Sequence, residues 1–477
     1  MMHTPTNTTL HEKRWQALAV ISIIQLILLL DATVVNVALP RIKHDLGLTD
    51  GSLTWIVNAY LITAGSLLLL GGRIGDAFGV RRTFQVGVVI FGGFSLLATF
   101  AQDATVLIIS RAGQGLGEAL ASATGLAMVS LLFPSGPERG KAFGIWAALG
   151  GLGSIIGVLL SGVLTHYLSW RWVFGINVPI VMLLIVAAAV MIPKFSHRSS
   201  TSLDLGNALI LVVAVAATVM AVMAVMGSGI EHLSGQRMAL LLLGMSGIAV
   251  VLLRCKRSEN GIIPARLMTR SPRMAGYAIV AILAATSGAL FYLGVLLLQD
   301  YLGLTPMQTG LAWLPFCLGF FPGIFLSQFV MQRWNSQAAA VVGLAVSALG
   351  FALFAFGVPL HSYWLGMLPA MLVTSIGFGC VAPVAQSLAT SDLSEADAGA
   401  GSGITTTLQQ LFQVFGVTLL AALALAVSDN SGVPTIDANG FVAAFAVSAL
   451  VMFGGALLIW AGRNALALEP TPSSPQP

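Results

Sequence analysis

The sequence predicts an all-helical protein that crosses a membrane many times. Of its 477 residues, 57% are hydrophobic and only 8% are charged, and the mean hydropathy is +0.91. Soluble domains carry about 25% charged residues. The apolar residues gather in runs long enough for membrane helices, which need about 20 residues to cross a ~30 Å hydrocarbon core. We therefore expect a polytopic membrane protein.

Apolar runs recur along the whole chain, separated by short polar loops. The predicted transmembrane helices are fourteen: 15–39, 52–71, 83–101, 105–132, 142–166, 171–192, 205–227, 237–253, 274–299, 308–330, 337–357, 363–390, 400–427 and 440–461. Each run is close to the length that a spanning helix needs.

A weak internal repeat suggests how these spans are grouped. Pro134–Lys141 leads into a glycine-rich fifth span, and Ser391–Asp397 leads in the same way into the thirteenth. Transporters are often built from such repeats. We therefore predict two six-helix bundles plus two extra central helices. The expected division is a tail at 1–14, bundles at 15–192 and 274–461, a linker at 193–273 that holds the extra helices and a basic loop, and a tail at 462–477.

The basic residues predict the orientation. The hairpin Gly71–Arg82 contains three arginines, and short cationic loops stay on the cytoplasmic side. With this loop inside, seventeen of the 22 lysines and arginines fall in cytoplasmic segments. Outer loops hold only Arg41, Lys43, Arg171 and Arg237. Both termini should therefore be cytoplasmic.

Several classes of function lack their sequence features. The charges lie in separate loops without a basic stripe, so no nucleic acid is expected. Cys255, Cys317 and Cys380 have no metal or disulfide spacing. No cluster of His, Cys and carboxylates lies within the spans, and no phosphate-binding loop occurs. We therefore predict neither an enzyme nor a primary pump, with no catalytic residues, no metal and no cofactor.

Two charges fall inside predicted spans at similar depth. Asp31 lies eight residues from the outer end of the first span and Arg111 six residues from that of the fourth, or about 12 and 9 Å deep at 1.5 Å per residue. A charge in a spanning helix is costly and is a functional hypothesis by default. An ion pair is therefore possible, serving proton coupling or gating, with a static structural pair as the alternative.

Glu118 is the second carboxylate inside a span. It follows Arg111 by seven residues, two turns along the same face of the fourth span and close to mid-membrane. An isolated carboxylate in this position can bind and release a proton or recognise a cation. Alternatively, neighbouring hydroxyls such as that of Ser122 satisfy it and it does nothing more.

Small residues line the fifth span. Gly150, Gly153, Gly157 and Gly162 permit close helix contacts, and they serve either general packing or a rocking motion between bundles.

Six segments together resemble a known family. They are Leu30–Pro40, Gly72–Arg82, Arg111–Gly117 and Trp170–Pro179, with Leu304–Gly310 and Ala398–Gly403 in the second half of the chain. These segments are similar to motifs of 14-span drug:proton antiporters of the major facilitator superfamily, the multidrug efflux type. The resemblance covers essentially the whole chain and implies a major facilitator fold. It links the arginine of the fourth-span motif, here Arg111, to proton coupling, and we predict that Asp31, Arg111 and Glu118 together carry that coupling.

The resemblance also implies a cytoplasmic gate loop and a substrate cavity. The gate loop comprises Gly72, Gly75, Asp76, Gly79, Arg81 and Arg82. We place Asn36, Gln114, Glu118 and Gln409 at the substrate cavity.

The sequence departs from the family pattern at three places. The fifth-span motif lacks its usual proline, because Val158 follows Gly157. Ala77 and Val80 stand where basic residues are common in the gate loop, and Glu118 stands where a small residue is usual.

We therefore expect a secondary transporter in a bacterial cytoplasmic membrane, driven by the proton gradient, that exports small hydrophobic or cationic compounds by alternating access. A carrier for one specific metabolite is the main alternative, and a membrane enzyme a remote one. The expected partners are the small-molecule substrate, protons and the lipid bilayer. We expect a monomer, with an accessory periplasmic protein as an open alternative.

Overall fold

Helices make up all the regular structure that the computed structural model describes, which covers residues 7–133, 137–193, 205–226, 235–257, 271–391, 398–428 and 436–462. The α-helices are α1 (Asn7–Leu46), α2 (Asp50–Phe78), α3 (Val80–Thr99), α4 (Ala104–Leu132), α5 (Pro137–Tyr167), α6 (Trp172–Gly175), α7 (Asn177–Met191), α8 (Leu205–Met226), α9 (Gly235–Arg257), α10 (Ser271–Leu296), α11 (Pro306–Ala312), α12 (Leu314–Arg333), α13 (Ser336–Gly357), α14 (Leu368–Ala389), α15 (Ala398–Val427) and α16 (Ala438–Ala461). Short π and 3-10 segments are η3 (Leu297–Tyr301), η4 (Val358–Leu360) and η5 (Tyr363–Met367).

Polar residues in the loops start several of these helices. The Thr49 side chain caps α2 in a reciprocal capping box with Ser52. Asp103 accepts from the backbone N–H of Val106 and so caps α4, and Asn335 caps α13 in the same way. These caps satisfy amide groups that have no partner inside the helix.

The helices confirm an all-helical, multi-pass membrane protein. Within the described residues, twelve are long and apolar enough to cross a membrane. Shorter apolar stretches, Ile156–Tyr167 and Met238–Val251, lie in α5 and α9, which occupy the fifth and eighth predicted spans. The count of fourteen therefore remains a prediction.

Some helix boundaries differ from the predicted spans. α1 already begins at Asn7, inside the predicted polar tail, because Asn7–Arg14 contains no proline or glycine that would stop a helix. The tenth span is divided at Trp313 into α11 and α12. Gly79 separates α2 from α3 and has a φ of +101°, a conformation that glycine adopts without strain.

Helix contacts divide the chain into two groups. In the first group α4 packs against α2 and α3, and α5 packs against α1. In the second group α14 packs against α12 and α13, and α15 packs against α10. We call α1–α7 the N-terminal bundle and α10–α16 the C-terminal bundle. The extra helices α8 and α9 pack against each other, and α8 also contacts α2 and α15.

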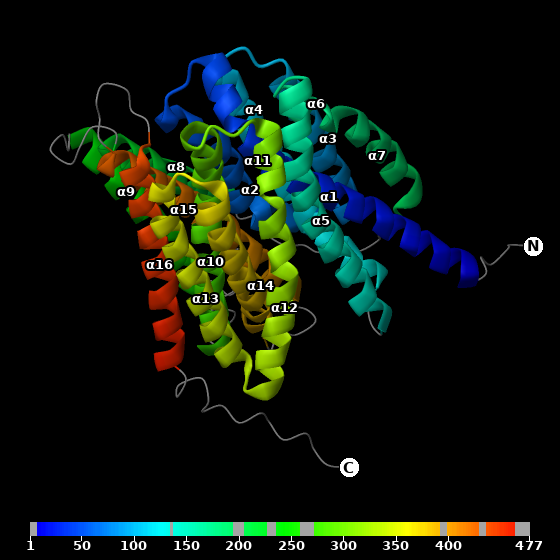
Figure 1. Ribbon diagram of the computed structural model, residues 1–477. Coiled ribbons are helices and arrows are strands. Elements are labelled where there is room, and N and C mark those ends of the chain that lie inside the picture. The colour runs from blue at the N-terminus through cyan, green and yellow to red at the C-terminus, as the bar shows by residue number, and fades with distance from the viewer. Residues whose placement is uncertain are drawn as a thin grey trace, which may run out of the picture.

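The two bundles meet mainly through two helix pairs, α2 with α15 and α5 with α11. Figure 1 shows the helices diverging from this region: α1, α5 and α7 run to the lower right, whereas α12, α13 and α16 run to the bottom. The bundles therefore part at the end of the molecule that holds the connection from α12 to α13.

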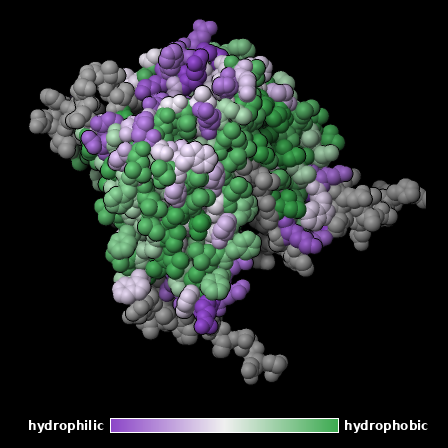
Figure 2. Space-filling view, in the orientation of Figure 1, coloured by the Kyte–Doolittle hydropathy of each residue, from purple (hydrophilic) through white to green (hydrophobic). Residues whose placement is uncertain are grey.

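Large apolar side chains cover the outer surface of the bundles. Val190 and Phe356 are each 80% exposed, and Leu183 and Leu458 are each 73% exposed. The face in Figure 2 shows a broad hydrophobic band with hydrophilic residues gathered above and below it. An apolar belt between polar ends is the surface that a lipid bilayer requires.

Candidate functional site

The two charges predicted inside spans meet between α1 and α4. Nη1 of Arg111 lies 2.6 Å from Oδ2 of Asp31. Asp31 is 0% exposed and Arg111 is 1% exposed. A buried charge is tolerated where it is paired and where further hydrogen bonds satisfy its remaining atoms.

Polar side chains from three further positions complete this buried network. Asn177, the first residue of α7, donates to Oδ1 of Asp31 at 2.6 Å. Gln114 donates to the same oxygen at 3.2 Å and accepts from Arg111 at 2.8 Å. Nε2 of Gln114 also donates to the Ser95 hydroxyl at 2.8 Å. Helices α1, α3, α4 and α7 thus share one hydrogen-bond network around a single carboxylate.

Aromatic rings and a backbone carbonyl enclose the guanidinium. The Cζ atom of Arg111 lies 4.1 Å from the centre of the Tyr60 ring and 5.9 Å from that of Phe174. Nε of Arg111 donates to the Ile56 carbonyl at 3.1 Å. Besides Asp31, the buried guanidinium therefore contacts a neutral carbonyl acceptor and the faces of two aromatic rings, which attract a cation.

Glu118 lies apart from the Asp31 network and meets the other bundle. Nε2 of Gln410 on α15 donates to Oε1 of Glu118 at 3.0 Å. Ser122, a candidate partner for Glu118, instead donates to Oε1 of Gln25 at 3.3 Å. The Tyr60 hydroxyl lies close to Glu118, so this tyrosine stands between both carboxylate sites.

The remaining residues of the predicted substrate cavity lie at separate positions. Asn36 is buried on α1 and donates to the Ala32 carbonyl at 3.3 Å, within its own helix. Gln409 is exposed on α15, and its neighbour Gln410 turns inward. Gln114 belongs to the Asp31 network. The structure therefore groups Gln114 with the buried charges and leaves Asn36 and Gln409 outside that group.

The glycines of the predicted gate loop pack α2 against α4. A side chain at Gly75 would meet the Thr124 methyl group at 2.6 Å, whereas one at Gly72 would touch only the Cβ atom of Ala123, at 4.0 Å. Gly79 then turns the chain into α3.

The charged residues of this loop point in different directions. Arg81 donates to the Ala189 carbonyl at 2.5 Å, near the C-terminal end of α7, where a cation is favourable. Asp76 and Arg82 are exposed, and Asp76 interacts electrostatically with Arg73. In this arrangement the loop is tied to its own bundle through Arg81.

Two glycines bring the backbone of α5 against α1. A side chain at Gly153 would meet the Leu26 carbonyl, and one at Gly157 would meet the Leu30 carbonyl at 2.8 Å. Gly150 is helical, and its side-chain surroundings lie outside the described residues.

Gly162 brings α5 against the other bundle. A side chain there would meet the Pro306 carbonyl at 2.8 Å and the Cα atom of Gly310 at 3.5 Å. Close contact of two glycines on facing helices lets the bundles approach backbone to backbone.

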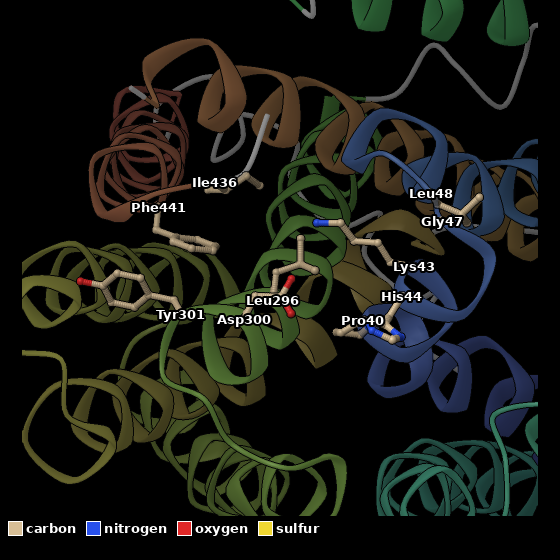
Figure 3. Close-up of a pocket in the computed structure, with 10 residues that line it drawn as sticks. All are labelled: Pro40, Lys43, His44, Gly47, Leu48, Leu296, Asp300, Tyr301, Ile436 and Phe441. Carbon is tan, nitrogen blue, oxygen red and sulfur yellow. The ribbon is translucent and has the colours of Figure 1, made fainter. Parts of the chain in front are cut away.

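A cavity of about 520 Å³ lies at the end of the molecule where α1 leads into α2. Figure 3 shows its walls: Lys43 and His44 come from α1, Asp300 and Tyr301 from the segment after α10, and Phe441 from α16. Both bundles therefore line it. None of its lining residues belongs to the Asp31 network.

Metal ligands do not gather in the part of the chain that the structure describes: it contains no group of three or more His, Cys, Asp or Glu that could hold a metal ion.

Asn177 holds the carboxylate of Asp31 in place. For the proton-driven transporter that the sequence predicts, Asn177→Ala should lower gradient-driven transport about tenfold, as the loss of one hydrogen bond to a charged group predicts. Transport into membrane vesicles measures this effect. Asn335→Ala, which removes the cap of α13, is a control that should leave transport unchanged. Equal loss in both variants would contradict a role of Asn177 at Asp31.

Two helical bundles, of which the N-terminal one encloses a buried network of charged and polar side chains, form the architecture of a membrane transporter. A profile of the Major Facilitator Superfamily matches residues 21–417, and the chain belongs to this family. The predicted family is thereby confirmed, and so is the prediction that the protein is not an enzyme.

Three of the relatives are named as resistance or export proteins. The chain is 33% identical to the puromycin resistance protein pur8 of Streptomyces alboniger, over 94% of this chain and 91% of that protein. It is 31% identical to the lincomycin resistance protein of Streptomyces lincolnensis, over 86% and 84%. It is 32% identical to the cephamycin export protein CmcT of Amycolatopsis lactamdurans, over 90% and 88%.

Among solved structures, a peptide transporter POT in complex with sulfate has the same fold. It superposes with a TM-score of 0.68 at 14% identity, covering 95% of each chain.

Proposed function

We propose that the protein exports small hydrophobic or cationic compounds from a bacterial cell in exchange for protons. The buried pair of Asp31 and Arg111 carries this proposal. An exporter of this kind needs a carboxylate that can take up a proton inside the membrane and that is linked to the helices that move. Asp31 lies inside the membrane span of α1, its hydrogen-bond partners come from α4 and α7, and one of them, Gln114, links it to Ser95 on α3.

Protonation of Asp31 would change the charge balance of the buried network around Arg111. A neutral Asp31 no longer compensates Arg111, and leaving one partner of a buried pair uncompensated costs about 3–5 kcal/mol. Arg111 then depends on Gln114, the Ile56 carbonyl and the Tyr60 ring. Binding of a proton therefore favours a rearrangement of α1 against α4, and deprotonation favours the compact network.

The divergence of the bundles supports alternating access. With the loop between α2 and α3 in the cytoplasm, as the distribution of basic residues predicts, the helices of the two bundles diverge toward the cytoplasmic side (Figure 1). There α2 and α15 stay in contact at Leu69 and Gly403, and the bundles also meet on the outer side. α5 meets α11 through Gly162 at this outer contact. The arrangement is inward-facing, with both termini in the cytoplasm, and a rocking of the bundles would produce the opposite state.

The names of the relatives favour export of toxic compounds. Puromycin, lincomycin and cephamycin appear in the names of three proteins that align with most of the chain. The alternative, a carrier for one metabolite, rests on the missing proline after Gly157 and on Glu118, which stands where the family usually has a small residue.

Inverted membrane vesicles with an imposed proton gradient test the proposal. Vesicles that contain the protein should accumulate ethidium or puromycin when their interior is acidified, and collapse of the gradient should release the compound. Vesicles with the Asp31→Asn variant should show no more uptake than vesicles without the protein. If neither probe moves in response to the gradient, the metabolite carrier becomes the better explanation.

A further inference from the structure

One hydrogen bond between the bundles involves a titratable side chain. Glu118 on α4 accepts from Gln410 on α15 at 3.0 Å, although the residues are 292 positions apart in the sequence. Glu118 is 4% exposed and Gln410 is 9% exposed. The packing around Gln410 is tight, since a side chain at Gly65 on α2 would meet its Cβ atom at 2.7 Å.

One polar atom of each side chain has no hydrogen-bond partner. Oε2 of Glu118 and Oε1 of Gln410 are buried and accept no hydrogen bond. Buried polar atoms are normally hydrogen-bonded, so two neighbouring unsatisfied acceptors need an explanation. A carboxylate can only accept hydrogen bonds, whereas a carboxylic acid carries one O–H donor.

We propose that Glu118 takes up a proton on Oε2 and that the resulting O–H donates a hydrogen bond to Oε1 of Gln410. The two side chains then form an acid–amide pair, joined by two hydrogen bonds, that holds the bundles together. The carboxylate plus one proton gives the carboxylic acid, and no other bond forms or breaks. The amide N–H continues to donate to Oε1 of Glu118. A single proton therefore satisfies both buried acceptors.

The groups around Glu118 leave this pairing available. Tyr60 on α2 lies within hydrogen-bonding reach of Glu118, but its single hydroxyl proton is directed at the Leu28 carbonyl, 3.3 Å away, and does not satisfy Oε2. Asp31 on α1 and Arg111 on α4 act on Glu118 electrostatically with opposite signs, and they are paired with each other.

Other contacts between the bundles have no such proton dependence. Nδ2 of Asn58 donates to the Thr418 hydroxyl at 2.9 Å, and Gln299 donates to the Val37 carbonyl at 2.8 Å. These side chains keep the same charge across the physiological range of pH. Protonation of Glu118 thus strengthens the contact between α4 and α15 and leaves these two contacts unchanged.

The direction of this effect fits the exchange cycle, and this part of the inference rests on the proposed function. A proton taken up from the outer side would favour the inward-facing arrangement described above. Release of the proton on the cytoplasmic side would loosen the contact and permit the return to the outward-facing state.

Distances between spin labels on the two bundles test the inference. Labels at Gln16 on α1 and Trp334 after α12, both exposed, would be placed in a variant whose three natural cysteines are replaced. In the wild type, lowering the pH should raise the ratio of molecules that show the present label-to-label distance to molecules that show another distance. The expected rise is about fivefold to tenfold, the effect of one hydrogen bond. In Glu118→Gln the new amide can form both hydrogen bonds at any pH, so that ratio should be high and independent of pH.

Matched variants separate the pair from general packing. Gln410→Leu should remove the pH dependence and lower the ratio, whereas Thr418→Val, which breaks a neighbouring bond between α2 and α15, should lower the ratio but keep the pH dependence. A wild-type pH profile in Glu118→Gln, or its loss in Thr418→Val, would overturn the inference.

Infrared difference spectra give a second measurement that does not depend on Gln410 variants. Acidification of the wild type should produce a carboxylic acid C=O band that is absent in Glu118→Gln, and its persistence there would overturn the inference. The pair can be tested in Asp31→Asn as well. If Asp31→Asn keeps the pH-dependent distance between the labels but shows no gradient-driven transport, the pair of Glu118 and Gln410 is supported independently of the proposed coupling at Asp31.

Discussion

Replacing Asp31 by Asn is expected to abolish gradient-driven transport and to destabilise the protein by about 3–5 kcal/mol, because Arg111 then remains buried without its counter-charge. Arg111→Gln should have a similar effect on stability. The double variant Asp31→Asn, Arg111→Gln removes both charges and should recover most of the lost stability. It should still show no gradient-driven transport.

Thermal unfolding of the purified variants and uptake into inverted vesicles measure the two effects separately. A static structural pair predicts a different result, since transport would then return together with stability in the double variant. Recovery of proton-driven uptake in that variant would contradict the coupling role of Asp31.

Replacing Gly157 by Leu is expected to give the second large effect, a loss of transport of at least about tenfold. The new side chain would meet the Leu30 carbonyl and the Thr33 hydroxyl on α1. A backbone atom of a packed helix cannot move aside as a flexible side chain can, and overpacking costs about 1–3 kcal/mol or more. α5 would therefore be pushed away from α1, and its contact with α11 would change as well.

Gly93→Leu on α3 is the matched control, because a side chain at Gly93 would meet nothing within 4 Å. This variant should keep wild-type uptake and a wild-type amount of protein in the membrane. Equal loss in both variants would indicate that any large residue harms insertion, and unchanged transport in Gly157→Leu would contradict the close contact of α5 with α1.

The helices and the depth of the buried charges could be predicted from local sequence. Long apolar runs can cross a membrane only as helices, so their positions follow from composition and length. Asp31 and Arg111 are interruptions in such runs, and counting residues from the helix ends was enough to place them at the same depth. A charge in an apolar run is a strong signal of a paired or functional residue, because burying a charge in a membrane costs free energy.

The neighbours of these charges could not be predicted in the same way. Asn177 was visible only as part of a motif, and its contact with Asp31 depends on how α7 packs against α1. From the sequence we place Gln409 at the cavity, whereas in the structure it is Gln410 that contacts Glu118. A shift of one residue turns a side chain by about 100° around a helix. The pairing of α4 with α15 joins residues far apart in the chain, so no local pattern contains it.

The central claim is that the Asp31 network links compound movement to proton movement. The most direct test uses purified protein in liposomes with a pH-sensitive dye inside and an ethidium gradient across the membrane. The wild type should move protons against the flow of ethidium and build a pH difference, and the double variant Asp31→Asn, Arg111→Gln should build none. Ethidium flow through the wild type without any pH change, or an unchanged pH response in the double variant, would contradict the claim.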